Sequence, residues 1–313
     1  FGIWISANHW NSRKAVEEQL RELEEYGFPA SVMVLEAWSD EATFYIWNGA
    51  DYEPKPDGEA HTCEEFDFSK SPYWPDPESM IRKLHEKDIR LVLWQIPVYK
   101  KQGMDERVCR QLELDRENAV RKAFCVRKED GSPYRIPEGN WFAGSMIPDF
   151  TNPETKKDWF GKRQYLLDMG VDGFKTDGGE FIYESDLLFS GGMTGAEAKN
   201  AYAQTYTDAY TQFLKEENVL FSRAGFAGAH RTPIHWGGDQ QSENGDIVVT
   251  KWIALEGTSI AAKEREEQLR RRFPAYLVEA AKGFDKYLSI IPEAAVAGKS
   301  GVWAMTDVTE GGR

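Results

Sequence analysis

The chain of 313 residues has few cysteines and no long apolar stretch. Its three cysteines, Cys63, Cys109 and Cys125, are an odd number without metal-site spacing, so we expect free thiols and no disulfide framework. No apolar run approaches the ~18 residues of a membrane-spanning helix, and no signal peptide is recognisable. These absences favour a cytoplasmic location and argue against a membrane partner.

Positive charge is also scarce, because the formal net charge is −14. This balance argues against nucleic acid or an anionic membrane surface as the main partner. No glycine-rich loop for a dinucleotide or a phosphate is present, and we expect neither a metal nor an organic cofactor. What the chain does hold is 41% hydrophobic residues and 11 tryptophans, which is ample for a core and for aromatic sugar platforms.

Short apolar runs alternate with helical patterns along the chain. Helix starts are indicated by Asn11, by Asp76-Pro77 and by Asn152-Pro153, the last two being a cap followed by proline at the first helical position. Six strands are predicted, five of them at residues 1–6, 30–35, 89–96, 219–222 and 233–236, and the fourth in chain order in the short apolar run that ends at Asp177. This order predicts an α/β fold, a TIM-type (β/α)8 barrel, with a doubly wound open sheet as the alternative.

Two long connections and an unusual last third complete the predicted organisation. Residues 39–75 and 98–150 are too long for ordinary connections, so we expect elaborated loops over the active face of the barrel. Residues 243–284 form an atypical insertion or replacement, with an extra strand at 246–253 and a charged helix at 263–272. We expect residues 1–313 to form one barrel domain with rearranged final units.

Polar side chains follow the predicted strands at the point where each strand ends. They are Glu36, Gln95, Asp177, Arg223 and Asp239. In a barrel these positions share the C-terminal face, where active sites lie. Two carboxylates on two strand ends suit cleavage of a glycosidic bond, with one as nucleophile and the other as acid/base.

The neighbours of the two carboxylates fit one role as nucleophile and one as acid/base. Lys175 and Arg223 would keep Asp177 ionised, whereas burial beside Trp236 would keep Asp239 protonated. Simpler readings remain open at this point. A carboxylate before glycine can cap a turn, the cations can form structural ion pairs, and the tryptophans can belong to the core.

Four segments in order resemble the catalytic barrel of glycoside hydrolase family 31 over residues 1–242, and residues 285–312 resemble it weakly. The segments are Leu35-Glu36-Ala37-Trp38, Asp149-Phe150-Thr151-Asn152-Pro153, Gly173-Phe174-Lys175-Thr176-Asp177-Gly178-Gly179-Glu180, and Phe221-Ser222-Arg223-Ala224-Gly225 with Trp236-Gly237-Gly238-Asp239.

The resemblance implies a retaining α-glycoside hydrolase, of α-glucosidase or α-galactosidase type, acting on a sugar or oligosaccharide. It implies that Asp177 is the nucleophile and Asp239 the acid/base. The positions that it assigns to substrate binding are Glu36, Trp94, Lys175, Arg223 and Asp307, and we add Trp38 and Trp236, which follow predicted strands, as further substrate-binding candidates.

The last third departs from the family pattern. The eighth strand, a histidine near the leaving group and the flanking β-domains are not recognisable. One account is that the inserted strand closes an eight-stranded barrel in a new order, which would leave no exposed sheet edge. The other is an engineered or truncated barrel. The alternative function is accordingly a non-catalytic carbohydrate-binding or designed barrel, and the oligomeric state is not indicated.

Overall fold

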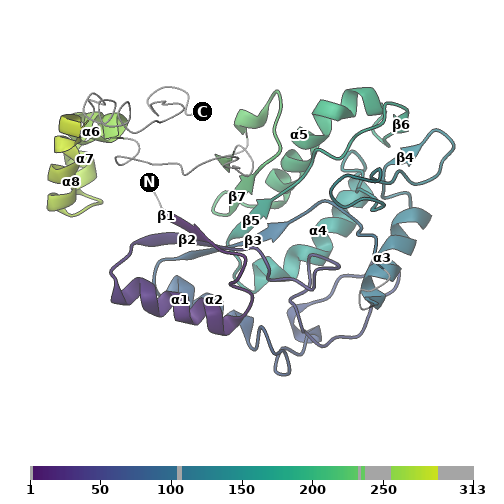
Figure 1. Cartoon of the computed structure of the whole chain (residues 1–313), viewed down its shortest axis with the longest axis horizontal. Coiled ribbons are helices and arrows are strands. Elements are labelled where there is room, and N and C mark those ends of the chain that lie inside the picture. Colours follow the sequence, from purple (N-terminus) through teal and green to yellow (C-terminus); the bar gives the residue numbers. More distant parts are fainter. Residues whose placement is uncertain (1–2, 104–107, 232–233, 237–254, 288–313) are drawn as a thin grey trace, which may run out of the picture. The chain divides into compact units, whose positions relative to one another are not determined.

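A six-stranded parallel sheet organises the first of the two compact units of the chain, 1–239 and 240–313, which we describe separately (Figure 1). The computed structural model describes residues 3–103, 108–231, 234–236 and 255–287. The strands of the sheet are β1 (Ile3–Ser6), β2 (Ala30–Leu35), β3 (Arg90–Gln95), β5 (Gly173–Thr176), β7 (Val219–Ser222) and β8 (Ile234–His235).

The order of the strands identifies the type of fold. Each strand pairs in parallel with the next sheet strand along the chain, in the order β1-β2-β3-β5-β7-β8. A doubly wound sheet reverses its direction of winding at a switch point, and the described strands have no such reversal. The sheet therefore winds in one direction, as in a TIM-type barrel, which confirms the predicted fold class.

Helices connect the strands of this unit within the described residues. They are α1 (Arg13–Glu25), α2 (Pro77–His85), α3 (Arg110–Arg121), α4 (Pro153–Asp168) and α5 (Gly195–Phe213). The Asp76 and Asn152 side chains cap α2 and α4, each with proline in the first turn, as predicted. The prediction that Asn11 caps α1 is wrong, because the Ser12 side chain accepts the hydrogen bond from Ala15 N.

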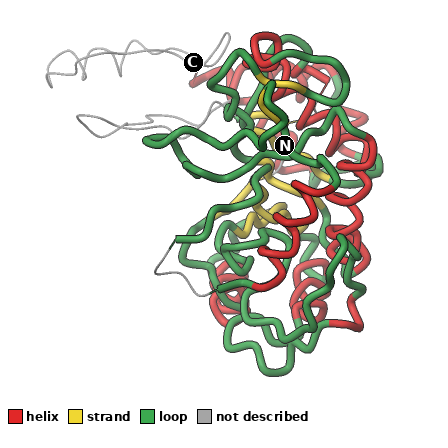
Figure 2. Tube along the Cα trace, turned by 90° about the vertical axis from the view of Figure 1, so that its right-hand side faces the viewer, coloured by secondary structure: helices red, strands yellow, loops and turns green. Residues whose placement is uncertain are grey.

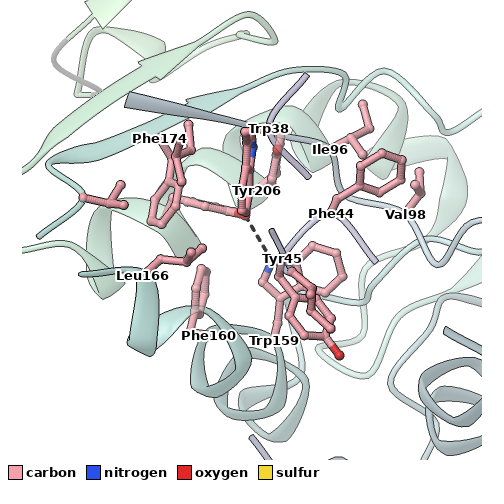
Figure 3. Packing of buried hydrophobic residues seen from close by; sticks show 14 of the residues in the cluster. Trp38, Phe44, Tyr45, Ile96, Val98, Trp159, Phe160, Leu166, Phe174 and Tyr206 are labelled. Atoms are coloured by element: carbon pink, nitrogen blue, oxygen red, sulfur yellow. Dashed lines mark hydrogen bonds between the residues drawn. The ribbon is translucent and has the colours of Figure 1, made fainter. Parts of the chain in front are cut away.

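The two faces of the sheet bury different side chains, since successive residues of a strand point to opposite faces. Met33 and Leu35 of β2 belong to the large core that includes helix residues. Figure 3 shows part of this core, with Phe160 and Leu166 of α4 beside Phe174 of β5. Val32 and Val34 belong to a small cluster with Val92 on the other face, with Trp4 and Val219 packed against it.

The predicted loop at 39–75 has little regular secondary structure, but its aromatic residues are packed together. Figure 2 draws all loops of the chain in green. Trp47 packs edge-on between Trp38 and Trp74, with ring centroids 5.0 and 5.1 Å apart, and all three are fully buried. The loop contains the 3-10 turn η1 (Cys63–Glu65). Outside this loop, the two-residue strands β4 (Arg127–Lys128) and β6 (Leu187–Leu188) form a separate antiparallel pair. The aromatic residues of the loop therefore extend the core.

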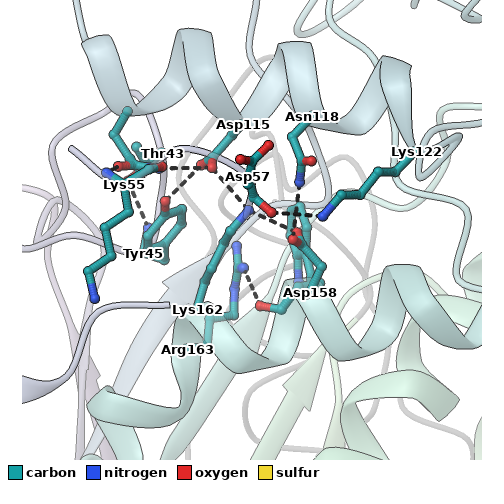
Figure 4. Close-up of polar contacts among 12 residues, drawn as sticks. Thr43, Tyr45, Lys55, Asp57, Asp115, Asn118, Lys122, Asp158, Lys162 and Arg163 are labelled. Atoms are coloured by element: carbon teal, nitrogen blue, oxygen red, sulfur yellow. Dashed lines mark hydrogen bonds and ion pairs between the residues drawn. The ribbon is translucent and has the colours of Figure 1, made fainter. Parts of the chain in front are cut away.

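A buried cluster of charges joins α3, α4 and this loop (Figure 4). Lys162 of α4 lies 3.0 Å from Asp115 of α3 and 2.8 Å from Asp158, and all three side chains are less than 10% exposed. The Tyr45 hydroxyl donates to Asp115 at 2.7 Å. Burial raises the pKa of the Asp158 carboxyl, against the attraction of Lys162.

The second unit is described only at its helices, α6 (Leu255–Glu264), α7 (Glu266–Arg270), α8 (Ala275–Lys282) and the 3-10 turn η3 (Gly283–Tyr287). The predicted single helix at 263–272 is wrong, because the chain leaves helical geometry at Arg265. Glu266 instead pairs with Arg270 at 2.8 Å and with Lys282 of α8 at 2.9 Å.

The predicted strand at 246–253 lies outside the described residues, as do residues 288–312 of the segment with the weak family resemblance. Closure into eight strands and the single-domain organisation therefore stay predictions. In the part of the chain that the structure describes, no helix has the length and apolar character to cross a membrane.

We expect Lys162→Met to lower the free energy of unfolding by about 3–5 kcal/mol, because it leaves two buried carboxylates without their cation. Urea unfolding followed by tryptophan fluorescence measures the change. Lys157→Met, on the exposed side of the same helix, is the control and should change stability by less than about 0.5 kcal/mol. Equal effects of the two substitutions would contradict the importance of the buried cluster.

The cysteines provide a second prediction. Burial raises the pKa of the Cys63 and Cys125 thiols to about 11, and it also raises the pKa of Cys109. Because the thiolate is the reactive form, Cys63 and Cys125 should react with a maleimide or disulfide reagent at pH 8 about 100-fold more slowly in the folded chain than in urea. Peptide mapping of the labelled thiols measures both rates, and fast labelling of folded Cys125 would refute the expectation.

Candidate functional site

The candidate site lies where β2, β3, β5 and β7 end, at one edge of the parallel sheet. The strand registers bring their last residues together. Trp94 pairs with Lys175, Lys175 with Phe221, and Thr176 with Ser222. Glu36, Asp177 and Arg223 come directly after β2, β5 and β7.

Asp177 is the centre of the site and is only 7% exposed. Its Oδ2 accepts a hydrogen bond from the Trp94 indole Nε1 at 2.9 Å, and its Oδ1 accepts one from Gly178 N at 2.8 Å. The Arg223 Nη1 atom lies 3.0 Å from the same Oδ1. Three groups, one of them charged, therefore hold the carboxylate in place.

Glycine is required directly after Asp177. Gly178 has a φ of +70°, and a Cβ there would lie 2.6 Å from Ile96 Cδ1 and 2.7 Å from the ring of Phe181. A side chain would therefore displace the loop that brings Gly178 N to the carboxylate.

A second ion pair lies beside the first. Lys175 Nζ is 2.8 Å from Glu36 Oε1, which also accepts a hydrogen bond from the Ser6 hydroxyl at 2.7 Å. The Lys175 ammonium lies 4.7 Å from the ring centroid of Trp236, a cation–π contact. The structure thus brings Glu36, Lys175 and Trp236 together, and both charged side chains are about 85% buried.

Arg223 connects the nucleophile position to a further carboxylate. Its Nε and Nη2 atoms donate to the two carboxylate oxygens of Glu180, at 3.3 and 3.0 Å. Its guanidinium also lies 5.3 Å from the ring centroid of Trp141. Arg223 is therefore held in a fixed orientation between Asp177 and Glu180.

Trp141 is a site residue that the sequence pattern did not indicate. It is 46% exposed, and its ring centroid lies 6.3 Å from that of Trp94. It lies in a long loop without periodicity, so no spacing predicted that it would reach the strand ends. Glu180 did carry a signal, since it ends the Gly173–Glu180 segment, but it was not predicted as a site residue.

Trp38 lies behind the site. Its side chain is fully buried, and its Nε1 donates to the Trp94 carbonyl oxygen at 2.9 Å.

The predicted residues Asp239 and Asp307 lie outside the described part of the chain. The described residues contain no group of three or more His, Cys, Asp or Glu side chains that could hold a metal ion.

A groove of about 500 Å³ lies beside β1 and α1, lined by Trp4, Ser6, Trp10, Tyr26 and Phe28 among others. Of the site residues described above, only Ser6 lines it. The site is therefore defined by the convergence of polar and aromatic side chains on Asp177, and we do not identify it with this groove.

Comparison with known proteins agrees with this geometry. Residues 1–255 match the model of the glycosyl hydrolases family 31 TIM-barrel domain. An isomaltosyltransferase of Sporosarcina globispora is 41% identical over 249 residues, covering 78% of this chain and 22% of that protein. A 1,3-alpha-isomaltosidase of Kribbella flavida is 38% identical over 246 residues, covering 77% of this chain and 33% of that protein.

Two solved structures are similar as well. The cycloalternan-forming enzyme from Listeria monocytogenes, in complex with a pentasaccharide substrate, has a TM-score of 0.73 at 40% identity, covering 77% of this chain and 23% of that one. The cycloalternan-degrading enzyme from Trueperella pyogenes, in complex with isomaltose, has a TM-score of 0.72 at 38% identity, covering 76% and 34%.

The chain thus spans about a fifth to a third of the length of these relatives. The family model covers most of the chain, and the relatives cover more than two thirds of it. The chain belongs to glycosyl hydrolase family 31.

Proposed function

We propose that this site performs the nucleophilic step of a retaining α-glycosidase. The observation that carries the proposal is the environment of Asp177, which is nearly buried, accepts hydrogen bonds from Trp94 and Gly178, and pairs with Arg223. Such a carboxylate is held in one direction by its donors, as attack on an anomeric carbon requires. A structure of the Trueperella enzyme with a covalent intermediate supports the same route for a relative.

The proposed reaction has two steps. An oxygen of Asp177 forms a bond to the anomeric carbon while the glycosidic C–O bond breaks, and the proton of Asp239 passes to the leaving oxygen. A water or a sugar hydroxyl then attacks the anomeric carbon and gives its proton to Asp239. The ester bond to Asp177 breaks, and the configuration is retained overall.

The remaining polar groups would position the sugar. The Glu36–Lys175 pair offers an acceptor and a donor to sugar hydroxyls, next to the aromatic face of Trp236. Arg223 would hold Asp177 and contact hydroxyls near the reacting carbon, and Trp94 and Trp141 would form an aromatic wall.

The substrate that we propose is an oligosaccharide with an α-linked glucosyl unit. The Sporosarcina and Kribbella relatives are named for isomaltosyl transfer and 1,3-α-isomaltosidase activity, and the solved relatives hold isomaltose or a pentasaccharide. Whether water or a sugar accepts the glycosyl unit decides between hydrolysis and transfer. α-Galactosides and α-xylosides are the competing substrates.

We expect the chain to hydrolyse 4-nitrophenyl α-glucoside in preference to the α-galactoside, the α-xyloside and the α-N-acetylgalactosaminide. Proton NMR of the released sugar should show the α-anomer first. Asp177→Asn should lower kcat by about 10⁴-fold or more, because the covalent route is lost. A folded chain that binds oligosaccharides, seen as a change in tryptophan fluorescence, but turns over none of them would favour the carbohydrate-binding alternative.

A second prediction concerns Arg223. Arg223→Lys should lower kcat/KM by about 10- to 100-fold, because one ammonium cannot hold both Asp177 and Glu180 in place. The matched control is Arg231→Lys. Arg231 pairs with Asp208 at a distance of 3.1 Å and not with Asp177, so this variant should leave kcat/KM unchanged. Equal activity of the two variants would remove Arg223 from the proposed mechanism.

A further inference from the structure

Gln95, the last residue of β3, is a fully buried hydrogen-bonding centre beside the nucleophile position. Its Oε1 accepts from Arg163 Nε at 2.6 Å and from the Tyr210 hydroxyl at 3.1 Å. Its Nε2 donates to the carbonyl oxygens of Phe44 at 2.8 Å and of Trp94 at 3.0 Å. The amide thus makes two accepted and two donated hydrogen bonds.

The direction of these hydrogen bonds fixes the orientation of the amide. A guanidinium nitrogen can only donate, so the side of the amide that faces Arg163 must be its oxygen. The amide nitrogen then necessarily faces the two carbonyl groups. Because Trp38 Nε1 donates to the same Trp94 carbonyl at 2.9 Å, the peptide that carries the Trp94 side chain is held by two donors.

Gln95 and Trp94 in turn hold Asp177. The backbone N–H of Asp177 donates to the Gln95 carbonyl at 2.8 Å, and the Trp94 indole donates to the Asp177 carboxylate at 2.9 Å. A continuous series of hydrogen bonds therefore leads from Arg163 through Gln95 to the carboxylate. Every group in it is fixed by a neighbour on another element.

The burial of the Arg163 guanidinium carries a desolvation cost. Its side chain is 1% exposed, and its guanidinium lies 3.7 Å from the ring centroid of Trp159. Among the described residues no carboxylate forms an ion pair with it, and its Nη2 atom is buried without a hydrogen-bond partner. An apolar side chain of similar length would fill this space at a lower desolvation cost. Two hydrogen bonds distinguish arginine here, from Nη1 to the Trp159 carbonyl oxygen at 2.9 Å within α4 and from Nε to Gln95, and only the second leads toward the site.

We propose that Arg163 and Tyr210 are positioning residues, which act through Gln95 to hold Trp94 and Asp177 in the reactive arrangement. The inference rests on the proposed function of Asp177 and adds to it a group on α4 and a group on α5 that touch no substrate. Loss of such positioning should lower kcat more than it raises KM, because a misplaced carboxylate destabilises the transition state while the substrate still binds.

The kinetic test compares Tyr210→Phe with Tyr202→Phe. Both tyrosines are on α5 and fully buried, but the Tyr202 hydroxyl donates to the Pro148 carbonyl at 2.8 Å and not to Gln95. Tyr210→Phe should lower kcat by about 3-fold and Arg163→Met by about tenfold, each with unchanged KM. Tyr202→Phe should leave both constants unchanged, and Arg163→Lys should recover part of the loss. Equal kcat in the two tyrosine variants would overturn the proposal.

A spectroscopic test does not depend on turnover. In the full chain labelled with ¹⁵N-tryptophan, the indole N–H resonance of Trp94 is identified by its loss in Trp94→Phe. This resonance should shift in Tyr210→Phe and Arg163→Met and keep its position in Tyr202→Phe. An unmoved resonance in a folded Tyr210→Phe variant would refute the positioning role, even where the wild type has no glycosidase activity. Absence of turnover with the expected shifts would instead refute the proposed function alone.

Discussion

The register between β3 and β5 is the constraint on which the candidate site depends. It places Gln95 opposite Thr176 and Trp94 opposite Lys175, so that the Asp177 N–H reaches the Gln95 carbonyl and the Trp94 indole reaches the Asp177 carboxylate. A shift of this register by one residue would turn the Trp94 side chain toward the helices and the Gln95 side chain toward the opposite face of the sheet. The indole would then no longer point at the carboxylate.

The two faces of these strands carry different kinds of contact. One face carries the charges that converge at the strand ends, including the Arg223–Asp177 and Lys175–Glu36 pairs. The other face is covered by helices and also contains polar contacts, such as the 2.6 Å hydrogen bond between the Thr176 and Ser222 hydroxyls. This buried, hydrogen-bonded layer supports the strands from which the charged groups project, and charged groups held in fixed directions are the condition for electrostatic catalysis.

Sequence patterns predicted the parts of this arrangement that depend on local chemistry. Proline after an aspartate or asparagine gave the starts of α2 and α4, and charged residues at the ends of apolar runs gave Glu36, Asp177 and Arg223. Contacts between distant segments were not predictable, because no periodicity connects Trp141 to Arg223 or Arg163 to Gln95. Charge alternation over 263–272 suggested one helix, whereas the pairing of Glu266 with Lys282 belongs to two.

The most direct test of the account is covalent labelling of the chain with an α-configured cyclophellitol-type inactivator, followed by mass spectrometry of its peptides. The account predicts one adduct per chain, on Asp177, formed more slowly when Arg223 is replaced by lysine and absent in Asp177→Asn. An adduct on another carboxylate, or unchanged labelling of Asp177→Asn, would contradict the assignment of the nucleophile.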